Sequence, residues 1–194
     1  MWSSPGRWLP RFLLIAAMLV APAAQARVKV SFYSHPWGMS ATGYLYFPHA
    51  FIVVDPDPQS STLSSRQSFG FTAVDSTAVL IVKHGPGMII PEDQRYRSVS
   101  SLHFSVEISD EQYAALQQGI DAWRSVPGDP YDLKKRNCIS FIAEMARLVN
   151  LKVPDVTTLD PAAFLERTRQ ANLERIKADA ALPPPDRTEL SPPN

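Results

Sequence analysis

The chain has 194 residues, of which 45% are hydrophobic and 20% are charged, and these are ordinary values for a soluble globular protein. This length is enough for one domain with a hydrophobic core but short for two. The 19 basic and 19 acidic residues give a net charge of zero, so bulk charge gives no reason to expect nucleic acid or an anionic membrane as the main partner.

The first 26 residues have the pattern of a signal peptide. Arg7 and Arg11 precede FLLIAAMLVAPAA, an apolar run that is too short to span a bilayer comfortably, and a small-residue Ala24-Gln25-Ala26 motif follows it. We therefore expect a secreted or periplasmic protein without a membrane span in its mature chain. Cleavage after Ala26 would remove two of the 19 basic residues and leave a net charge of −2. An uncleaved N-terminal anchor is the alternative.

The first half of the mature chain is predicted to form β-strands. Apolar runs bounded by Pro, Asp, Ser or Gly occupy residues 27–32, 43–55, 67–75, 77–84 and 101–109. In the last run, Leu102, Phe104, Val106 and Ile108 alternate onto one face. The KHGPG stretch at residues 83–87 is predicted to be a tight turn. Because the connections are short enough for hairpins, we expect the sheet to be mostly antiparallel.

The second half is predicted to be helical. Three helix starts have capping signals, which are Ser109 with Gln112, Asn137, and Asp160 with Pro161. The corresponding helices are expected over residues 110–125, 138–149 and 161–182, with an apolar face that fades toward the end of the third. Strands followed by helices, without βαβ alternation, predict an α+β fold in which the sheet packs against the helices.

These patterns divide the chain into three parts. Residues 1–26 are the expected signal peptide, residues 27–171 the folded domain, and residues 172–194 a Pro-rich tail. We expect the tail to be flexible because it contains too little apolar surface to order itself.

Cys138 is the only cysteine of the chain. Exported proteins that use cysteine structurally use it in pairs, so a single cysteine is either sheltered in the core or kept as a reactive thiol. Cys138 falls on the first turn of its predicted helix, where free N–H groups and the helix dipole stabilise a thiolate. It also heads the apolar stripe of that helix, so a small buried core residue is the alternative.

A nucleophilic cysteine needs a base, which is usually a histidine. His49 lies within YLYFPHAFIVV, one of the most apolar stretches of the mature chain, and an ionisable ring in such surroundings needs a partner. A core histidine with satisfied hydrogen bonds is the alternative. His35 and His84 are expected in a loop and a turn, and His103 is expected to face solvent or an uncovered face of the sheet.

YDLKKRNCISFI at residues 131–142, with PHAFIVV at residues 48–54 far upstream, resembles circularly permuted members of the papain-like, NlpC-type hydrolase superfamily. The permuted branch includes the lecithin:retinol acyltransferase-like proteins. In this superfamily the nucleophilic cysteine opens a helix that packs against an antiparallel sheet, and the histidine base lies on a strand. The order His49 then Cys138 matches the permuted branch, in which the histidine strand comes first. The resemblance covers about residues 44–150.

The resemblance implies roles for three residues. Cys138 would be the nucleophile and His49 the general base, and Tyr131 falls where members of the superfamily often place a tyrosine near the nucleophile. For Tyr131, a packing or turn role is an equal alternative.

The residue that orients the histidine is expected on the neighbouring strand. If Val54 lies opposite Gln67 in an antiparallel pair, Thr72 lies opposite His49, with Ser68 as the alternative on the same face. This second strand contains no Asp, Glu, Asn or His, which departs from the family pattern.

Other chemistries have no motif in the sequence. HExxH, CxxC and clustered acidic patterns are missing, as are a GxSxG elbow and a Gly-rich phosphate loop, so neither a metal nor a cofactor is expected. We expect an exported cysteine hydrolase of thiol-protease type that cleaves amide bonds through an acyl-enzyme, with peptidoglycan peptides as the first substrate class. The alternatives are a non-catalytic periplasmic binding domain associated with the envelope, and an acyltransferase.

Overall fold

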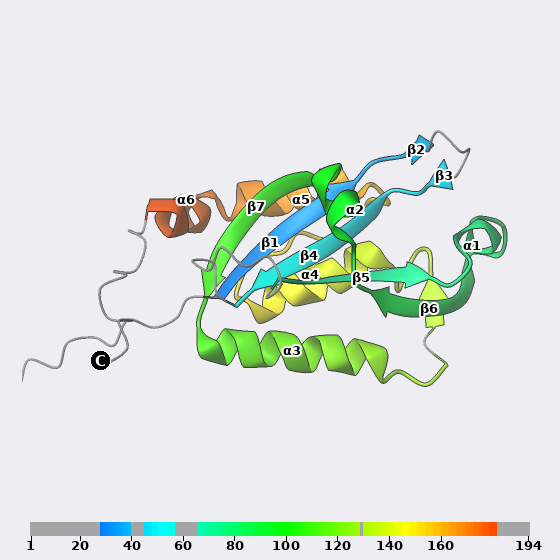
Figure 1. Ribbon diagram of the computed structural model, residues 1–194, viewed down its shortest axis with the longest axis horizontal. Helices are drawn as coiled ribbons and strands as arrows, with labels where there is room; N and C mark the ends of the chain where they lie inside the picture. The colour runs from blue at the N-terminus through cyan, green and yellow to red at the C-terminus, as the bar shows by residue number, and fades with distance from the viewer. Residues whose placement is uncertain (1–27, 40–44, 57–65, 129, 182–194) are drawn as a thin grey trace, which may run out of the picture.

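The structure of the protein is a computed structural model that describes residues 28–39, 45–56, 66–128 and 130–181. The expected signal peptide, residues 1–26, lies outside these ranges. Within them the fold is α+β, with a six-stranded antiparallel sheet and six helices (Figure 1). In these same ranges, no helix has the length and apolar character needed to cross a membrane.

The main sheet has the strand order β7-β1-β4-β5-β6-β8, and all neighbouring strands are antiparallel. Its strands are β1 (Val28–His35), β4 (His49–Asp55), β5 (Gln67–Ala73), β6 (His84–Ile90), β7 (Ser101–Ile108) and β8 (Pro130–Asp132). A separate pair is formed by β2 (Gly38–Met39) and β3 (Leu45–Tyr46). Five of the six main strands come from the first half of the mature chain, which confirms the predicted origin of the sheet.

The longest helices cover one face of the sheet. The helices are α1 (Ser76–Val82), α2 (Gln94–Ser98), α3 (Asp110–Arg124), α4 (Cys138–Leu148), α5 (Pro161–Ala171) and α6 (Leu173–Ala181). Helix α4 packs on β4 and β5 and lies between α3 and α5 (Figure 1). All three predicted helix starts are confirmed, because the side chains of Ser109, Asn137 and Asp160 each accept a backbone N–H of the first turn.

The run at residues 77–84, predicted to be a strand, forms α1 instead. Asp75 begins the helix because its side chain accepts the N–H of Ala78 at 2.8 Å, and Lys83 ends it with a left-handed φ of 68°. The residues predicted to form a turn after Lys83 belong to β6, which starts at His84. A helix cap at Asp75 therefore outweighs the strand preference of the β-branched residues that follow it.

The predicted alternation of β7 breaks near its start. Phe104, Val106 and Ile108 are buried, but Leu102 is exposed. The reason is a register shift in the ladder with β1, since Phe32 pairs with Phe104 while the next residue, Tyr33, pairs with Leu102. His103, which lies between these pairs, was expected to face solvent or an uncovered face of the sheet. It is half-buried, and its Nε2 shares a 2.8 Å hydrogen bond with the Ser34 hydroxyl.

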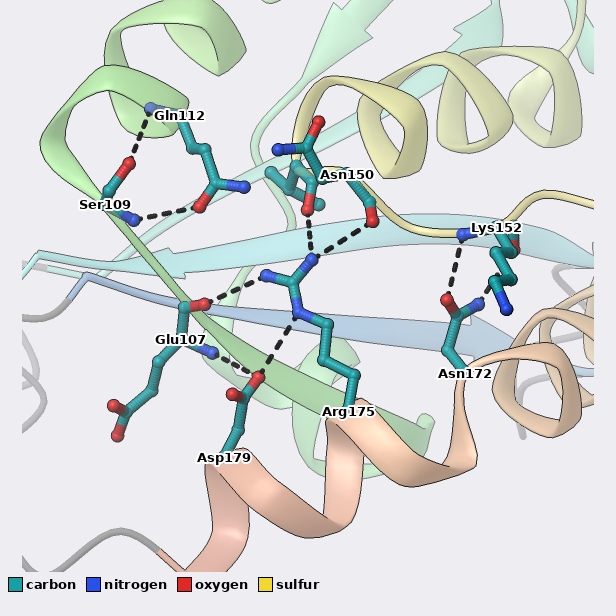
Figure 2. A network of polar contacts seen from close by, with 9 residues as sticks. Glu107, Ser109, Gln112, Asn150, Lys152, Asn172, Arg175 and Asp179 are labelled. Atoms are coloured by element: carbon teal, nitrogen blue, oxygen red, sulfur yellow. Dashed lines mark hydrogen bonds and ion pairs between the residues drawn. The ribbon is translucent and has the colours of Figure 1, made fainter.

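The folded domain extends beyond residue 171, where we expected a flexible tail to begin. Helix α6 packs along β7, and its Arg175 donates hydrogen bonds to the backbone carbonyls of Val149, Asn150 and Glu107 (Figure 2). The Asn172 side chain bonds both the N–H and the C=O of Lys152. Side-chain hydrogen bonds to backbone groups thus hold α6 in place, although its apolar face is weak. Residues 182–194 lie outside the described ranges.

Candidate active site

Cys138 is the first residue of α4, and the residues before it fix its position. The Asn137 side chain accepts the Ser140 N–H at 3.0 Å, and the Ser140 hydroxyl accepts the Asn137 N–H at 2.7 Å, which makes a capping box. Asn137 Nδ2 also donates to the Leu133 carbonyl at 2.7 Å. Because Asn137 is buried and both ends of its side-chain amide are hydrogen-bonded, the thiol at the start of the helix has a defined position.

His49 is the first residue of β4, and its ring lies over Gly70 of β5. A β-carbon at position 70 would lie 2.4 Å from His49 Nε2, so only glycine leaves room for the ring. The recorded β4–β5 pairs run from Val54 with Gln67 to Ile52 with Phe69, which confirms the predicted register. Toward the start of β4 the two strands spread apart (Figure 1), and the ring occupies this end.

The His49 ring connects the thiol with a carboxylate. The ring lies close enough to Cys138 for the thiol to raise the pKa of His49, and its Nε2 lies 3.1 Å from Glu92 Oε1. All three side chains are buried. In the described part of the chain neither Nε2 nor Oε1 has a hydrogen bond of good geometry, so their contact is an ion pair.

These contacts keep the buried ring charged. Burial alone would lower the pKa of His49, but the hydrogen bonds and charges of Cys138 and Glu92 outweigh it and raise the pKa from 6.5 to about 9. With this pKa the ring carries its proton at neutral pH and lies beside the Glu92 carboxylate. Such a ring can donate a proton to a leaving group and stabilise a thiolate beside it.

His35, predicted in a loop, lies opposite His49 in the β1–β4 ladder. Burial and then the charge of His49 lower the pKa of His35. Its ring packs against Tyr96, with 4.3 Å between ring centroids, and Nδ1 lies 3.3 Å from the Ser100 hydroxyl. His35 is therefore neutral at pH 7 and packs behind the charged ring.

Glu92 contacts the His49 ring, where we predicted Thr72 as the residue that orients the histidine. It lies between β6 and α2, one strand further from His49 than the neighbouring strand β5. Ser68, the predicted alternative, contributes indirectly, because its hydroxyl accepts the Glu92 N–H at 2.7 Å and donates to the Glu92 carbonyl at 2.9 Å. Thr72 lines the cavity beside His49. In the sequence Glu92 follows the apolar end of β6 after Pro91, and this position alone does not indicate a contact with His49.

Tyr131 lies near the thiol and also packs in the core. It belongs to β8 and stacks on Phe71, with 5.6 Å between ring centroids. Burial and then the charge of Cys138 raise the pKa of Tyr131 above its ordinary value of 10. Its hydroxyl therefore stays protonated and can donate a hydrogen bond.

A cavity of about 810 Å³ reaches His49 and Glu92, and Cys138 lies behind its lining residues. His49, Thr72, Glu92 and Tyr131 line it together with apolar side chains that include Trp37, Phe47, Leu80 and Leu159. Its size fits a substrate of ordinary small-molecule or short-peptide dimensions. Among the residues that the structure describes, no group of His, Cys, Asp and Glu side chains is arranged to hold a metal ion.

The sequence prediction thus placed two of the three central residues. Cys138 and His49, 89 positions apart in the chain, lie close enough for the thiol to raise the pKa of the ring, and the charge of Cys138 also raises the pKa of Tyr131. Comparisons with protein-family models, curated proteins and solved structures find no match to this chain. The chemical interpretation of the site therefore rests on its own geometry.

Proposed function

We propose that this protein is a cysteine-dependent acyl-transfer enzyme, in the first instance a hydrolase of amide bonds. The observation that carries this proposal is the buried His49 ring, which contacts the Cys138 thiol on one side and the Glu92 carboxylate on the other. A nucleophile, a base and a group that orients the base are the parts that covalent acyl transfer needs.

Burial argues against a purely structural role for these residues. Placing a carboxylate and an imidazole in an apolar interior is unfavourable unless they are paired and hydrogen-bonded. Here His49 Nε2 and Glu92 Oε1 face each other at 3.1 Å, and in the described part of the chain neither atom has a hydrogen bond of good geometry. A non-catalytic binding domain would gain stability from apolar side chains at the same positions. A catalytic role therefore explains the buried His49 and Glu92 side chains better than a structural role does.

The reaction follows from the positions of these groups. The Cys138 thiolate attacks the substrate carbonyl, and the resulting oxyanion can be met by N–H groups at the head of α4 or by the Tyr131 hydroxyl. The His49 imidazolium protonates the leaving amine as the C–N bond breaks, which leaves a thioester on Cys138. Neutral His49 then takes a proton from water, whose oxygen attacks the thioester and frees the acid and the thiol.

Within the first turn of α4, two N–H groups are taken by the cap. Ser140 N–H donates to Asn137 Oδ1 and Phe141 N–H to the Asn137 carbonyl. The N–H groups of Cys138 and Ile139 precede these in the turn, and helix geometry gives such groups no partner inside the helix. They are the backbone donors that we assign to the oxyanion.

An acyltransferase is the second candidate, and the cavity favours it. Much of the lining is aromatic or aliphatic, including Trp37, Phe47 and Tyr131, and such a lining accepts an apolar acyl group and limits access of water to the thioester. The two candidates share the acyl-enzyme and differ only in the acceptor. Measuring hydrolysis against transfer to an added amine or alcohol distinguishes them.

We also propose that the protein acts outside the cytoplasm, on the strength of the N-terminal pattern and the single cysteine. Peptidoglycan stem peptides are then the first amide substrates to assay. Fractionation of cells that express the full chain tests the location, and soluble peptidoglycan fragments analysed by mass spectrometry test the substrate.

The decisive experiment combines thiol labelling with trapping of the acyl-enzyme. We expect iodoacetamide to alkylate native Cys138, and a 4-nitrophenyl ester to leave an acyl adduct on it. His49→Asn should slow both reactions by about 100-fold or more, and Cys138→Ser should abolish both while the fold persists. If native Cys138 reacts only after denaturation, or if His49→Asn reacts as fast as wild type, the proposal is wrong.

A further inference from the structure

The C-terminal half of α1 presents apolar side chains to solvent. Ile81 is 77% exposed and Val82 52% exposed, and Leu80 is also exposed. Val74, which precedes the N-cap of the helix, is exposed as well; we call these four residues the α1 patch. A helix on the surface of a globular protein normally has a polar outer face. Here Val79 faces the protein, and Ile81, two residues or about 200° further around the helix, points away from it.

The position of α1 makes this patch accessible to a large partner. The helix stands at one end of the molecule, beyond the ends of β5 and β6 (Figure 1). Leu80 belongs both to the patch and to the lining of the cavity that holds His49 and Glu92. Exposed apolar side chains that are grouped on one short segment mark an interaction site more often than scattered ones do.

Basic side chains border the patch. Lys83 follows α1 directly, and its carbonyl accepts the N–H of Leu133 at 2.9 Å, which brings the turn with Lys134 and Lys135 beside the end of the helix. All three lysines are exposed. The acidic residue of this turn, Asp132, accepts the N–H groups of both Lys134 and Lys135. Its carboxylate offsets part of the positive charge of this turn, and the three lysines outnumber it.

We propose that the α1 patch and its three lysines dock on an anionic phospholipid bilayer. Apolar side chains that enter the boundary between headgroups and acyl chains, with lysines among the headgroups, are the combination that peripheral membrane proteins use. The neutral bulk charge of the chain does not oppose this, because the attraction acts within about 10 Å of the surface. Docking places the mouth of the cavity at the bilayer.

This proposal does not depend on catalysis by Cys138. A protein without a reactive thiol would dock by the same surface, so the test uses variants that lack the thiol. Its failure would leave the acyl-transfer proposal standing, and failure of acyl transfer would leave the docking proposal standing.

The first experiment asks which face touches the bilayer. An environment-sensitive fluorophore is attached to Ile81→Cys in a full chain that also carries Cys138→Ala, so that the label occupies one site. The matched control places the same label at Leu102→Cys on β7, where the native leucine is also 53% exposed. With vesicles of phosphatidylcholine and phosphatidylglycerol, we expect a blue shift and a several-fold brightening at position 81 and no change at position 102.

Because the N-terminal apolar run is present in every variant, the comparison between the two label sites reports on α1 alone. Vesicles of phosphatidylcholine without the anionic lipid should give a much weaker signal at position 81. A silent label at position 81, or equal responses at positions 81 and 102, would overturn the proposal.

The second experiment measures binding by vesicle flotation with unlabelled protein. Ile81→Ser with Val82→Ser, and separately Lys134→Gln with Lys135→Gln, should each reduce the partition coefficient by about tenfold or more, whereas Leu102→Ser should leave it unchanged. Circular dichroism checks that each variant is folded. Partitioning that is insensitive to both pairs would overturn the proposal. So would light scattering that shows a wild-type dimer dissociated by Ile81→Ser, since a second copy would then cover the patch.

Discussion

At position 70 the absence of a side chain leaves room for the His49 ring. A β-carbon there would lie 2.4 Å from His49 Nε2 and 3.0 Å from Glu92 Oε1, and both are closer than non-bonded atoms normally approach. Gly70→Ala should therefore destabilise the fold by about 1–3 kcal/mol through overpacking and should displace the ring from Cys138. Urea unfolding measures the first effect, and the iodoacetamide rate of native Cys138 measures the second.

Gly85→Ala is the control for this substitution. A β-carbon at position 85 would meet a methyl group of Val79 at 3.3 Å, a contact that a small movement relieves, so we expect a loss below about 1 kcal/mol and an unchanged labelling rate. If Gly70→Ala labels as fast as wild type, the ring is not held where the structure places it.

The pKa of His49 predicts how stability depends on pH. A folded-state pKa of about 9 lies above the ordinary value of 6.5, so the charged ring stabilises the fold fully below pH 6.5. This contribution is lost as the pH rises through 9. The shift corresponds to at most about 3 kcal/mol. We expect the free energy of unfolding, measured with urea, to fall over this interval.

His49→Asn separates this effect from other groups that titrate at alkaline pH. The variant should lose clearly less stability than wild type between pH 6.5 and 9, because asparagine carries no proton to release. Equal losses in the two proteins would mean that the ring is not the group that titrates.

At the scale of elements, the cap of α4 aligns the thiol. Asn137→Ala removes the acceptor for the Ser140 N–H and the donor to the Leu133 carbonyl. We expect it to destabilise the fold by about 1–2 kcal/mol and to slow alkylation of Cys138. Asp160→Ala removes the cap of α5 and should cost about 1 kcal/mol without changing the alkylation rate. Equal labelling of the two variants would show that the cap does not position the thiol.

Local signals explain which elements could be predicted from the sequence. The helices that begin after Ser109, Asn137 and Asp160 were predicted because each cap and its partner lie within three residues. Helix α1 was missed because a single residue, Asp75, decides between a helix and a strand for an apolar, β-branched run that fits both.

In the candidate site, too, some residues could be predicted from the sequence and one could not. Cys138 and His49 were singled out from residue type, predicted helix position and apolar neighbours, and their pairing was favoured by a family resemblance. The β4–β5 register was predicted from an antiparallel pairing. Glu92 was not found because its place beside His49 depends on how β6 leads into α2, and on Ser68 binding the Glu92 backbone from β5. Such contacts are set by tertiary structure and leave no short pattern in the sequence.

At the scale of the whole molecule, the sheet has an edge strand that α6 protects. β7 ends the strand order, and an edge strand with free N–H and C=O groups can pair with another chain. Near the end of β7, the Glu107 N–H donates to Asp179 and the Glu107 carbonyl accepts from Arg175 (Figure 2). Two side chains of α6 therefore occupy backbone groups that a second molecule would otherwise use.

Removing α6 should both weaken the fold and expose this edge. A chain that stops after Asn172 loses the charged hydrogen bonds of Arg175 to Val149 and Asn150 at the end of α4, so we expect a loss of at least about 2 kcal/mol. It also leaves the Glu107 backbone groups open, so we expect association that increases with protein concentration. Urea unfolding and light scattering after size-exclusion chromatography measure the two effects. A chain that stops after Ala181 keeps Arg175 and Asp179 and should behave as wild type in both measurements. If the two truncated chains have equal stability and equal mass in solution, α6 neither holds the end of α4 nor protects β7.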